Sequence, residues 1–445
     1  MPLRTLLLAA LLVAAGCAAP AATPPVTDGD SAPTDPETET GNSATPPDPS
    51  VSSVSPTLQA SPTASATAST ASPRALAEEH EVRVAGGSLP VEFDLVFARV
   101  AVAMDRPTVE PPSVVRVEPN ESMRLGGSEY PEFYRLLGFR VAEEREHAVT
   151  AAAYVATPES VVVNEAALGN ASDAESTLAH ESVHVVQYRT GAFERLAGTA
   201  AVPPGSTAER LLRAAIVEGS ATYVQGAYVR RYAPEAPQPT ASLRARAARG
   251  SPAERLGVAP YLAGERYVDA RVSDPGEVRE VYDDPPRTAE ELLHDRPPGS
   301  EPVVPLTVRD APEDGWTSDP ETTDTYGELF VRVVLETGVD ESAAADAAHG
   351  WGNDVRRRFV GADDEGSTRT GYAWAIRFDD GANATAFAEA FGTWRESRPA
   401  NASTVRLARP APETVVLLLG DERFVRGASP SWRDGTVTVR VNGTG

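Results

Sequence analysis

The sequence contains no lysine, one cysteine and only six histidines in 445 residues. The single cysteine, Cys17, excludes an internal disulfide and any zinc site built from cysteine thiolates. All 40 basic residues are arginine, and the 64 acidic residues give a formal net charge of -24. This charge repels phosphates and argues against nucleic acid as a partner. It suits very high salt, where carboxylates stay hydrated, and predicts an extremely halophilic source; a GC-rich genome would explain the missing lysine but not the excess of acid.

The chain also lacks an apolar run long enough to span a bilayer. The run from Leu6 to Val13 follows Arg4 and is typical of a secretory signal. The small residues that end in Gly16-Cys17 resemble a lipobox, in which Cys17 is lipidated and becomes the mature N-terminus. Residues 1–17 are therefore predicted to be a lipoprotein signal peptide, and the protein to be secreted and anchored to the outer face of the cell membrane. Plain signal-peptidase cleavage near Ala15 is the alternative.

Residues 18–75 have almost no large apolar side chains. A segment of Ala, Pro, Thr, Ser and Asp cannot bury enough surface to offset the entropy of ordering its backbone, so it is predicted to be a disordered tether. An exterior location also agrees with five sequons for N-glycosylation, at Asn120, Asn170, Asn383, Asn401 and Asn442.

Two of the six histidines lie four residues apart, as His180-Glu181-x-x-His184. Residues four apart share one face of a helix, so both imidazoles can bind one zinc ion. Glu181 then lies beside the metal, where it can accept a proton from a zinc-bound water. The alternative is a surface helix that carries two histidines by chance.

Glu218 is the candidate third ligand, because it lies on an otherwise apolar face of a second predicted helix. A carboxylate in such a position is costly unless it is paired or bound to metal. Two histidines and a glutamate leave the fourth tetrahedral position for water, as a catalytic zinc site requires. The small side chain of Gly219 would allow close approach of a neighbouring helix. An ion pair with Arg213 or Arg230 is the alternative for Glu218.

Capping signals predict that both motifs lie on helices. Ser172-x-x-Glu175 predicts a helix from about residue 173 to 188, and Ser206-x-x-Glu209 predicts one that ends near Tyr232, before Pro234. A helix pair is predicted within residues 341–359. Strands are predicted at residues 89–97, 113–117, 150–154, 160–164, 372–378, 414–419 and 436–441. Of these, 160–164 is expected to form the edge of the cleft.

The two motifs together, His180-Glu181-x-x-His184 and Glu218-Gly219-Ser220-Ala221, resemble the gluzincin branch of the zincin metallopeptidases. The segments 285–294 and 350–354 resemble segments of gluzincin-like surface proteins of halophilic archaea. The resemblance implies Zn2+ as the cofactor, a peptide or protein substrate and Glu181 as the general base. Some gluzincins place an aspartate four residues after the glutamate ligand, but this chain has Thr222. The sequence therefore leaves open whether Glu175 or Glu328 supplies the carboxylate that would orient a metal-bound histidine.

The expected fold class is α+β. A zincin-like metallopeptidase domain, with an edge strand, the HExxH helix and the glutamate helix, is expected over residues 76–365. A small C-terminal α/β subdomain is expected over residues 366–445. Two functions follow: a membrane-tethered zinc metallopeptidase, or a catalytically inactive zincin-like lipoprotein with a binding or structural role at the cell surface.

The sequence does not rank the candidates for a residue that donates to the oxyanion or contacts the substrate. By default Tyr223 is a core residue, and the alternative for His294 is a histidine that caps a helix end. The candidates are Tyr223, Tyr228, Tyr326 and His294.

Overall fold

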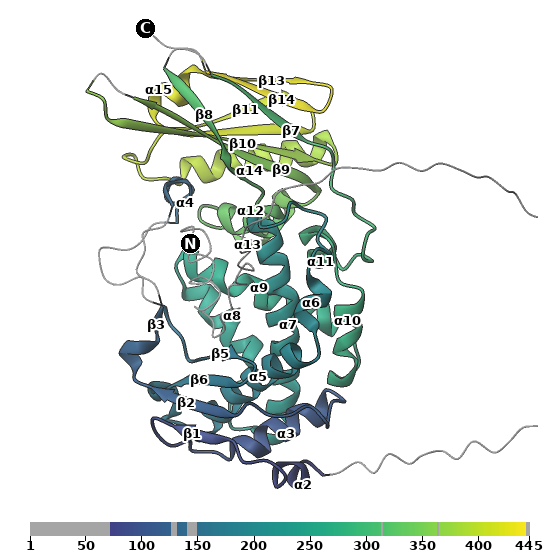
Figure 1. The fold of residues 1–445 in the computed structure, drawn as a ribbon. Helices are drawn as coiled ribbons and strands as arrows, with labels where there is room; N and C mark the ends of the chain where they lie inside the picture. Colours follow the sequence, from purple (N-terminus) through teal and green to yellow (C-terminus); the bar gives the residue numbers. More distant parts are fainter. Residues whose placement is uncertain (1–71, 126–130, 140–148, 313–314, 363–364, 442–445) are drawn as a thin grey trace, which may run out of the picture. The chain divides into compact units, whose positions relative to one another are not determined.

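The structure is a computed structural model that describes residues 72–125, 131–139, 149–312, 315–362 and 365–441. It is a mixed α+β structure, as expected (Figure 1). Cys17 and most of the predicted tether lie outside the described residues. The last residues of that predicted tether belong to helix α2 (Pro73–Ala77), which Ser72 caps. Within the described ranges, no helix combines the length and the apolar character needed to cross a membrane.

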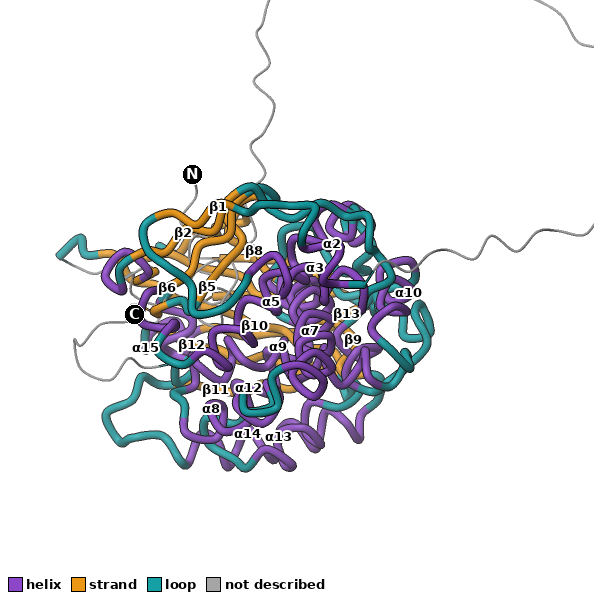
Figure 2. The backbone as a smooth tube through the Cα atoms, turned by 90° about the horizontal axis from the view of Figure 1, so that it is seen from below, coloured by secondary structure: helices purple, strands orange, loops and turns teal. Residues whose placement is uncertain are grey.

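A four-stranded sheet has the order β1-β2-β6-β5 and lies beside helix α5 (Figure 2). Strands β1 (Arg83–Ala85), β2 (Val114–Glu118) and β6 (Ser160–Asn164) are parallel, whereas β5 (Ala153–Thr157) pairs antiparallel with β6. The strand predicted at residues 160–164 is confirmed, and the one predicted at residues 150–154 lies a few residues later, as β5. The expectation that residues 160–164 form an edge was wrong, because β6 is hydrogen-bonded on both sides, whereas β1 and β5 are the edge strands of this sheet among the described residues. The continuous apolar run Val161–Val163 fits a strand that is buried on both faces.

The segment expected to be a strand at residues 89–97 instead leads into helix α3 (Phe93–Ala103). Its β-branched and aromatic residues favoured a strand, but Phe93, Val96, Phe97 and Val100 recur at helical spacing and are all buried. Packing of this face against α5 therefore decided the secondary structure.

Long helices carry the two sequence motifs. The two motif-bearing helices are α5 (Ala171–Arg189) and α7 (Thr207–Tyr232), and α9 (Pro252–Asp269) packs along α7. The shorter helices are α4 (Glu132–Leu136), α6 (Ala192–Leu196), α8 (Pro239–Arg249), α10 (Arg279–Asp283), α11 (Ala289–Leu293), α12 (Gly327–Leu335), α13 (Glu341–Ala348), α14 (Gly381–Glu396) and α15 (Glu422–Gly427).

A five-stranded antiparallel sheet has the order β11-β12-β10-β9-β8. A three-stranded sheet, β13-β14-β7, and a two-stranded one, β3-β4, complete the strands. Their bounds are β3 (Arg124–Leu125), β4 (Val149–Thr150), β7 (Thr307–Pro312), β8 (Trp316–Asp324), β9 (Trp351–Ala362), β10 (Thr368–Phe378), β11 (Val405–Ala411), β12 (Thr414–Gly420), β13 (Ala428–Arg433) and β14 (Thr436–Val441).

Two expectations concern the five-stranded sheet: the helix pair within residues 341–359, which is wrong, and the division between residues 365 and 366. The helix pair predicted within residues 341–359 is helix α13 followed by strand β9, because pairing with β8 and β10 fixes residues 351–362 as a strand. The expected division between residues 365 and 366 falls between the paired strands β9 and β10. The sheet thus includes residues from both sides of that division.

Asp354 of β9 fixes the start of α12. Its buried carboxylate accepts hydrogen bonds from the backbone N–H groups of Tyr326 and Gly327 at 2.9 and 2.8 Å. The indoles of Trp351 and Trp374 donate to it at 3.0 and 2.9 Å. Four donors offset the cost of burying this charge, and the carboxylate lies where the helix dipole favours an anion. Trp351 is a core residue.

Candidate metal centre

Helix α5 begins two residues earlier than its capping signal suggested. Asn170 is the N-cap residue, and its Oδ1 accepts hydrogen bonds from the N–H groups of Ser172 and Asp173 at 2.9 and 3.2 Å. The predicted capping box of Ser172 and Glu175 is therefore wrong. Glu175 instead pairs with Arg99 at 2.8 Å. Asn170 precedes Ser172 by two residues and satisfies the same unpaired N–H groups, so the helix itself was predicted correctly.

Helix α7 begins at the predicted cap and is held close to α9. The Ser206 hydroxyl accepts a hydrogen bond from the N–H of Glu209 at 3.2 Å. Farther along, Gly219 faces Gly264 of α9, and a Cβ added at Gly219 would lie 2.2 Å from the carbonyl carbon of Gly264. Only glycine allows the two backbones to approach this closely. This contact fixes α7 at the turn that carries Glu218.

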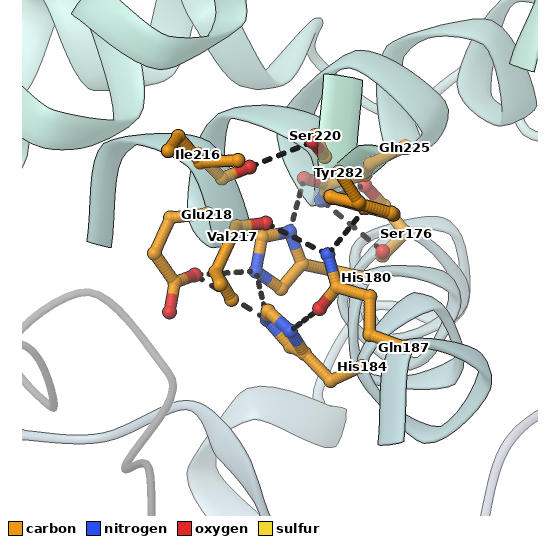
Figure 3. A network of polar contacts seen from close by, with 10 residues as sticks. All are labelled: Ser176, His180, His184, Gln187, Ile216, Val217, Glu218, Ser220, Gln225 and Tyr282. Atoms are coloured by element: carbon orange, nitrogen blue, oxygen red, sulfur yellow. Dashed lines mark hydrogen bonds and ion pairs between the residues drawn. The ribbon is translucent and has the colours of Figure 1, made fainter. Parts of the chain in front are cut away.

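His180, His184 and Glu218 converge on one point (Figure 3). The Nε2 atoms of the two histidines are 3.1 Å apart, and each lies 3.3 Å from Oε2 of Glu218. Four ligands at zinc-bonding distance in a tetrahedron are separated by about 3.3 Å, so this triangle matches one face of such a tetrahedron. Within the described structure Glu218 is not paired with Arg213 or Arg230. The predicted ligand set is thus brought together.

Two glutamines orient the histidines (Figure 3). The Nδ1 of His180 lies 3.1 Å from Oε1 of Gln225, and the Nδ1 of His184 lies 2.6 Å from Oε1 of Gln187. The amide nitrogen of Gln187 donates to the carbonyl of Val217 at 2.9 Å, and that of Gln225 donates to the carbonyl of Ser176 at 3.1 Å.

Carbonyl oxygens can only accept hydrogen bonds, so these contacts fix which end of each amide faces its histidine. Each Nδ1 must then carry a hydrogen, and each neutral imidazole presents the lone pair of Nε2 to the common point. Neither Glu175 nor Glu328 orients a ligand, contrary to the expectation. Glutamines were overlooked because the family pattern directs attention to carboxylates.

The buried charges of the three side chains depend on one another. Burial alone would raise the pKa of Glu218, but the adjacent His184 and His180 lower it to about 2. Burial alone would lower the pKa of His184, but the charge of Glu218 and its hydrogen bond raise it to about 9. Burial lowers the pKa of His180. Without a metal ion, a proton on His184 therefore supplies the positive charge that the buried carboxylate requires.

Glu181 and His180 open onto a cleft of about 260 Å³. Ala153 of β5 lines the cleft, and so do Thr222 of α7 and Tyr261 of α9. The ring of Tyr261 stacks on that of His180, with 6.2 Å between the centroids and 19° between the planes. No sequence pattern identifies Tyr261 as part of the site, since a tyrosine in an amphipathic helix is ordinarily a core residue.

The four candidates for an oxyanion or substrate contact lie elsewhere; none lines the cleft. The hydroxyl of Tyr223 donates to the carbonyl of Val272 at 3.4 Å, and that of Tyr228 to Glu175 at 2.7 Å. Tyr326 packs against aromatic rings in the core, with 4.5 Å between its centroid and that of Phe330.

His294 is the C-cap residue of α11, which confirms its interpretation as a histidine at a helix end. It belongs to a second triad that could hold a metal ion, together with the buried Glu290 and Glu328, and is itself partly exposed. The Nε2 of His294 lies 2.9 Å from Oε1 of Glu328. Arg332 donates to that same oxygen through Nε and Nη2, at 2.9 and 2.6 Å. Burial and the charges of nearby acids, Asp379 first among them, raise the pKa of Glu290 to about 8.

Three of the predicted glycosylation sites, Asn120, Asn170 and Asn401, are exposed. Asn383 is partly buried, and its Nδ2 is packed so close to Gly350 that a Cβ there would lie 1.8 Å away. Asn442 lies outside the described residues. Attachment of a sugar to Asn383 is therefore sterically opposed, and glycosylation of the other sites stays a prediction.

Comparison with known proteins gives one match. A family model for a domain of unknown function (DUF8575) matches residues 315–444, which run from β8 through β14. No curated protein and no solved structure matches the chain. The family match covers the C-terminal sheet and α12 but does not include α5 or α7. The case for a function therefore depends on the geometry around His180, His184 and Glu218.

Proposed function

We propose that the protein is a zinc-dependent metallopeptidase of the zincin-like, gluzincin type. The supporting observation is the triangle of Nε2, Nε2 and Oε2 atoms, with edges of 3.1, 3.3 and 3.3 Å, at the side of a cleft. The glutamine contacts support it further, because they hold both Nδ1 atoms and direct each Nε2 to the common point, where a metal ion can displace the proton of His184. His180, His184 and Glu218 would hold the ion. When bound, zinc supplies the Lewis acidity that makes water nucleophilic near neutral pH.

Glu181 would act as the general base. It is adjacent to the ligand His180, is only 1% exposed and lines the cleft. Its carboxylate would accept a proton from the attacking water and deliver it to the amine that leaves. Glu181 lies two turns inside α5, and the residues around it are buried. Its motion is therefore limited, which favours that proton transfer.

The edge strand β5 would bind the substrate backbone. Ala153 lines the cleft, and among the described strands β5 pairs only with β6. An extended peptide can add to such an edge by main-chain hydrogen bonds. This assigns to β5 the role that the sequence had suggested for residues 160–164.

Secretion and anchoring through Cys17 remain part of the proposal. They explain how a peptidase would act outside the cell, and mass spectrometry of the membrane fraction tests them directly. An unmodified Cys17 in the mature protein would contradict the lipid anchor.

Glu181→Gln tests the function. The variant should retain about one zinc ion per chain, because Glu181 is not a ligand, and should lose hydrolysis by about 10²- to 10⁴-fold. Metal analysis and a peptide-cleavage assay give the two readouts. Equal cleavage by the variant and the parent would refute the mechanism. Zinc binding without cleavage by either would favour the inactive zincin-like module.

A further inference from the structure

We propose that the protein binds a small inorganic anion, of the size of chloride, in a pocket near the end of α5, and that the bound anion strengthens metal binding through Tyr282. The pocket shares no lining residue with the cleft. The anion site does not depend on the proposed function. Its effect on zinc rests on the metal centre formed by His180, His184 and Glu218.

The pocket lies where several helix ends meet. It has a volume of about 40 Å³. A water molecule needs about 10–15 Å³, so this space suits a few waters or one small anion. The described residues that line it are Met104 and Arg106 at and after the end of α3, Val186 and Thr190 at the end of α5, Arg195 of α6, Pro275 before α10, and Arg279 and Tyr282 of α10.

The charge of the pocket is opposite to that of the chain. Three of its lining residues are arginines, Arg106, Arg195 and Arg279, and the described residues that line it include no acidic side chain. The chain as a whole has 64 acidic residues and a formal net charge of -24. A guanidinium group offers several N–H donors in a fixed plane, and its hydrogen bonds to an anion are strong because both groups are charged.

Neighbouring carboxylates balance only part of this positive charge. Asp283 contacts two of the arginines, at 3.0 Å from Nε of Arg195 and 3.1 Å from Nε of Arg279. One carboxylate shared by two guanidinium groups leaves a net positive charge. Asp105 lies 3.7 Å from Arg106, but its side chain is largely exposed, so water screens this pair. The pocket therefore has positive charge that an anion can neutralise.

A bound anion would also hold separate segments together. Arg106 follows α3, Arg195 belongs to α6 and Arg279 belongs to α10. Without an anion their like charges oppose this arrangement. An ion that binds the folded protein and not the unfolded chain raises the free energy of unfolding. The anion should therefore stabilise the fold around the end of α5.

Tyr282 connects the pocket to the metal centre (Figure 3). It is buried and lines the pocket, and its hydroxyl accepts a hydrogen bond from Nε2 of Gln187 at 2.9 Å. The Oε1 of Gln187 lies 2.6 Å from Nδ1 of His184. Tyr282 follows Arg279 by three residues on α10, so the two lie on one side of that helix.

An anion that holds Arg279 should therefore hold Tyr282 against Gln187 and keep His184 in the orientation that binds metal. A fixed ligand orientation raises metal affinity. The coupling is reciprocal, so zinc should raise the affinity for the anion by the same factor.

Unfolding of the metal-free full chain tests the anion site. Sodium chloride should raise the unfolding midpoint to a plateau, relative to sodium gluconate at the same ionic strength, because gluconate is too large for the pocket. The difference between the salts should vanish in the double variant Arg106→Gln/Arg279→Gln. It should persist in the control Arg433→Gln, whose side chain on β13 is 91% exposed. No difference in the parent, or the same difference in the double variant, would overturn the site.

Zinc affinity tests the coupling. In saturating chloride the parent should bind zinc about fivefold more tightly, or more, than in gluconate. Tyr282→Phe keeps the ring but removes the hydroxyl, so this ratio should fall to near one while chloride still raises the unfolding midpoint. Competition with a chelator, corrected for zinc that chloride binds in solution, measures the ratio.

Two results would overturn the coupling: a ratio near one in the parent, or an unchanged ratio in Tyr282→Phe. Absence of zinc binding in both salts would overturn the proposed function together with the coupling, whereas the anion site is decided by the unfolding experiment alone.

Discussion

Two clusters of histidine and glutamate lie within the described part of the chain, and they balance the charge of a buried carboxylate in different ways. In the triad of His180, His184 and Glu218, no arginine contacts the carboxylate within the described structure, and the three facing atoms are 3.1 to 3.3 Å apart. In the triad of Glu290, His294 and Glu328, the guanidinium of Arg332 lies 2.6 Å from Glu328 and 3.2 Å from His294. The second triad already holds its cation.

This difference shows that residue types alone do not make a metal site. A buried carboxylate needs a positive charge, and a protein can supply it with a proton, an arginine or a metal ion. Arg332 lies four residues after Glu328 on α12, so the helix itself delivers that charge. The first triad has only a proton on His184, which a metal ion can displace.

The largest expected effect comes from Glu218→Gln. It should lower the zinc content from about one ion per chain to near zero and abolish hydrolysis, because two histidines are left without the anionic ligand. Glu290→Gln is the matched control, and should leave the zinc content unchanged. Metal analysis after dialysis measures both. Loss of zinc from the control instead would place the principal metal site in the second triad.

Arg332→Met should destabilise the fold by about 3 kcal/mol, because it leaves the fully buried Glu328 without its cation. Denaturant unfolding measures this cost. If Arg332 is what excludes a metal from the second triad, added zinc should recover part of the lost stability in this variant and raise the stoichiometry above one. An unchanged stoichiometry would mean that the geometry of the second triad, and not its arginine, excludes the ion.

The zinc affinity of the first triad should depend on pH. The pKa of His184 is raised to about 9 in the metal-free protein, so zinc must displace a proton below that pH. The apparent affinity should therefore rise by about tenfold for each pH unit up to about pH 9.

The same pKa shift affects the stability of the metal-free protein. Its stabilising contribution is fully present below pH 6.5, the ordinary pKa of histidine, and is lost as the pH rises through about 9. Competition with a chelator at several pH values, corrected for protonation of the chelator, measures the slope of affinity. A flat profile would contradict the assignment of this proton to His184.

A smaller effect is expected from Gln225→Leu. Loss of the amide removes the acceptor for Nδ1 of His180, and loss of a hydrogen bond to a metal-binding histidine weakens metal binding by about 10- to 100-fold. Gln238→Leu, a partly exposed residue that begins α8 without a side-chain capping bond, is the control and should bind zinc like the parent. Equal zinc affinity of the two variants would show that Gln225 does not orient the ligand.

Local features of the sequence were read most reliably. The spacing of His180 and His184, the cap at Ser206 and the stop before Pro234 depend on residues within a few positions of one another. The prediction of a strand at residues 89–97 was wrong because the spacing of its apolar residues fits both a strand and a helix. The prediction of a helix over the residues of β9 was wrong because pairing with distant strands outweighed the local preference of these residues for a helix.

The sequence by itself determined which side chains could bind a metal and that two helices would carry them, because helix periodicity and capping are local. Only the tertiary structure decided that Glu218 meets the histidines while Glu328 meets an arginine. It also decided that Gln225, 45 residues from His180, fixes that ring. These contacts join segments far apart in the chain, so they depend on how the helices pack, for example through the backbone contact of Gly219 with Gly264.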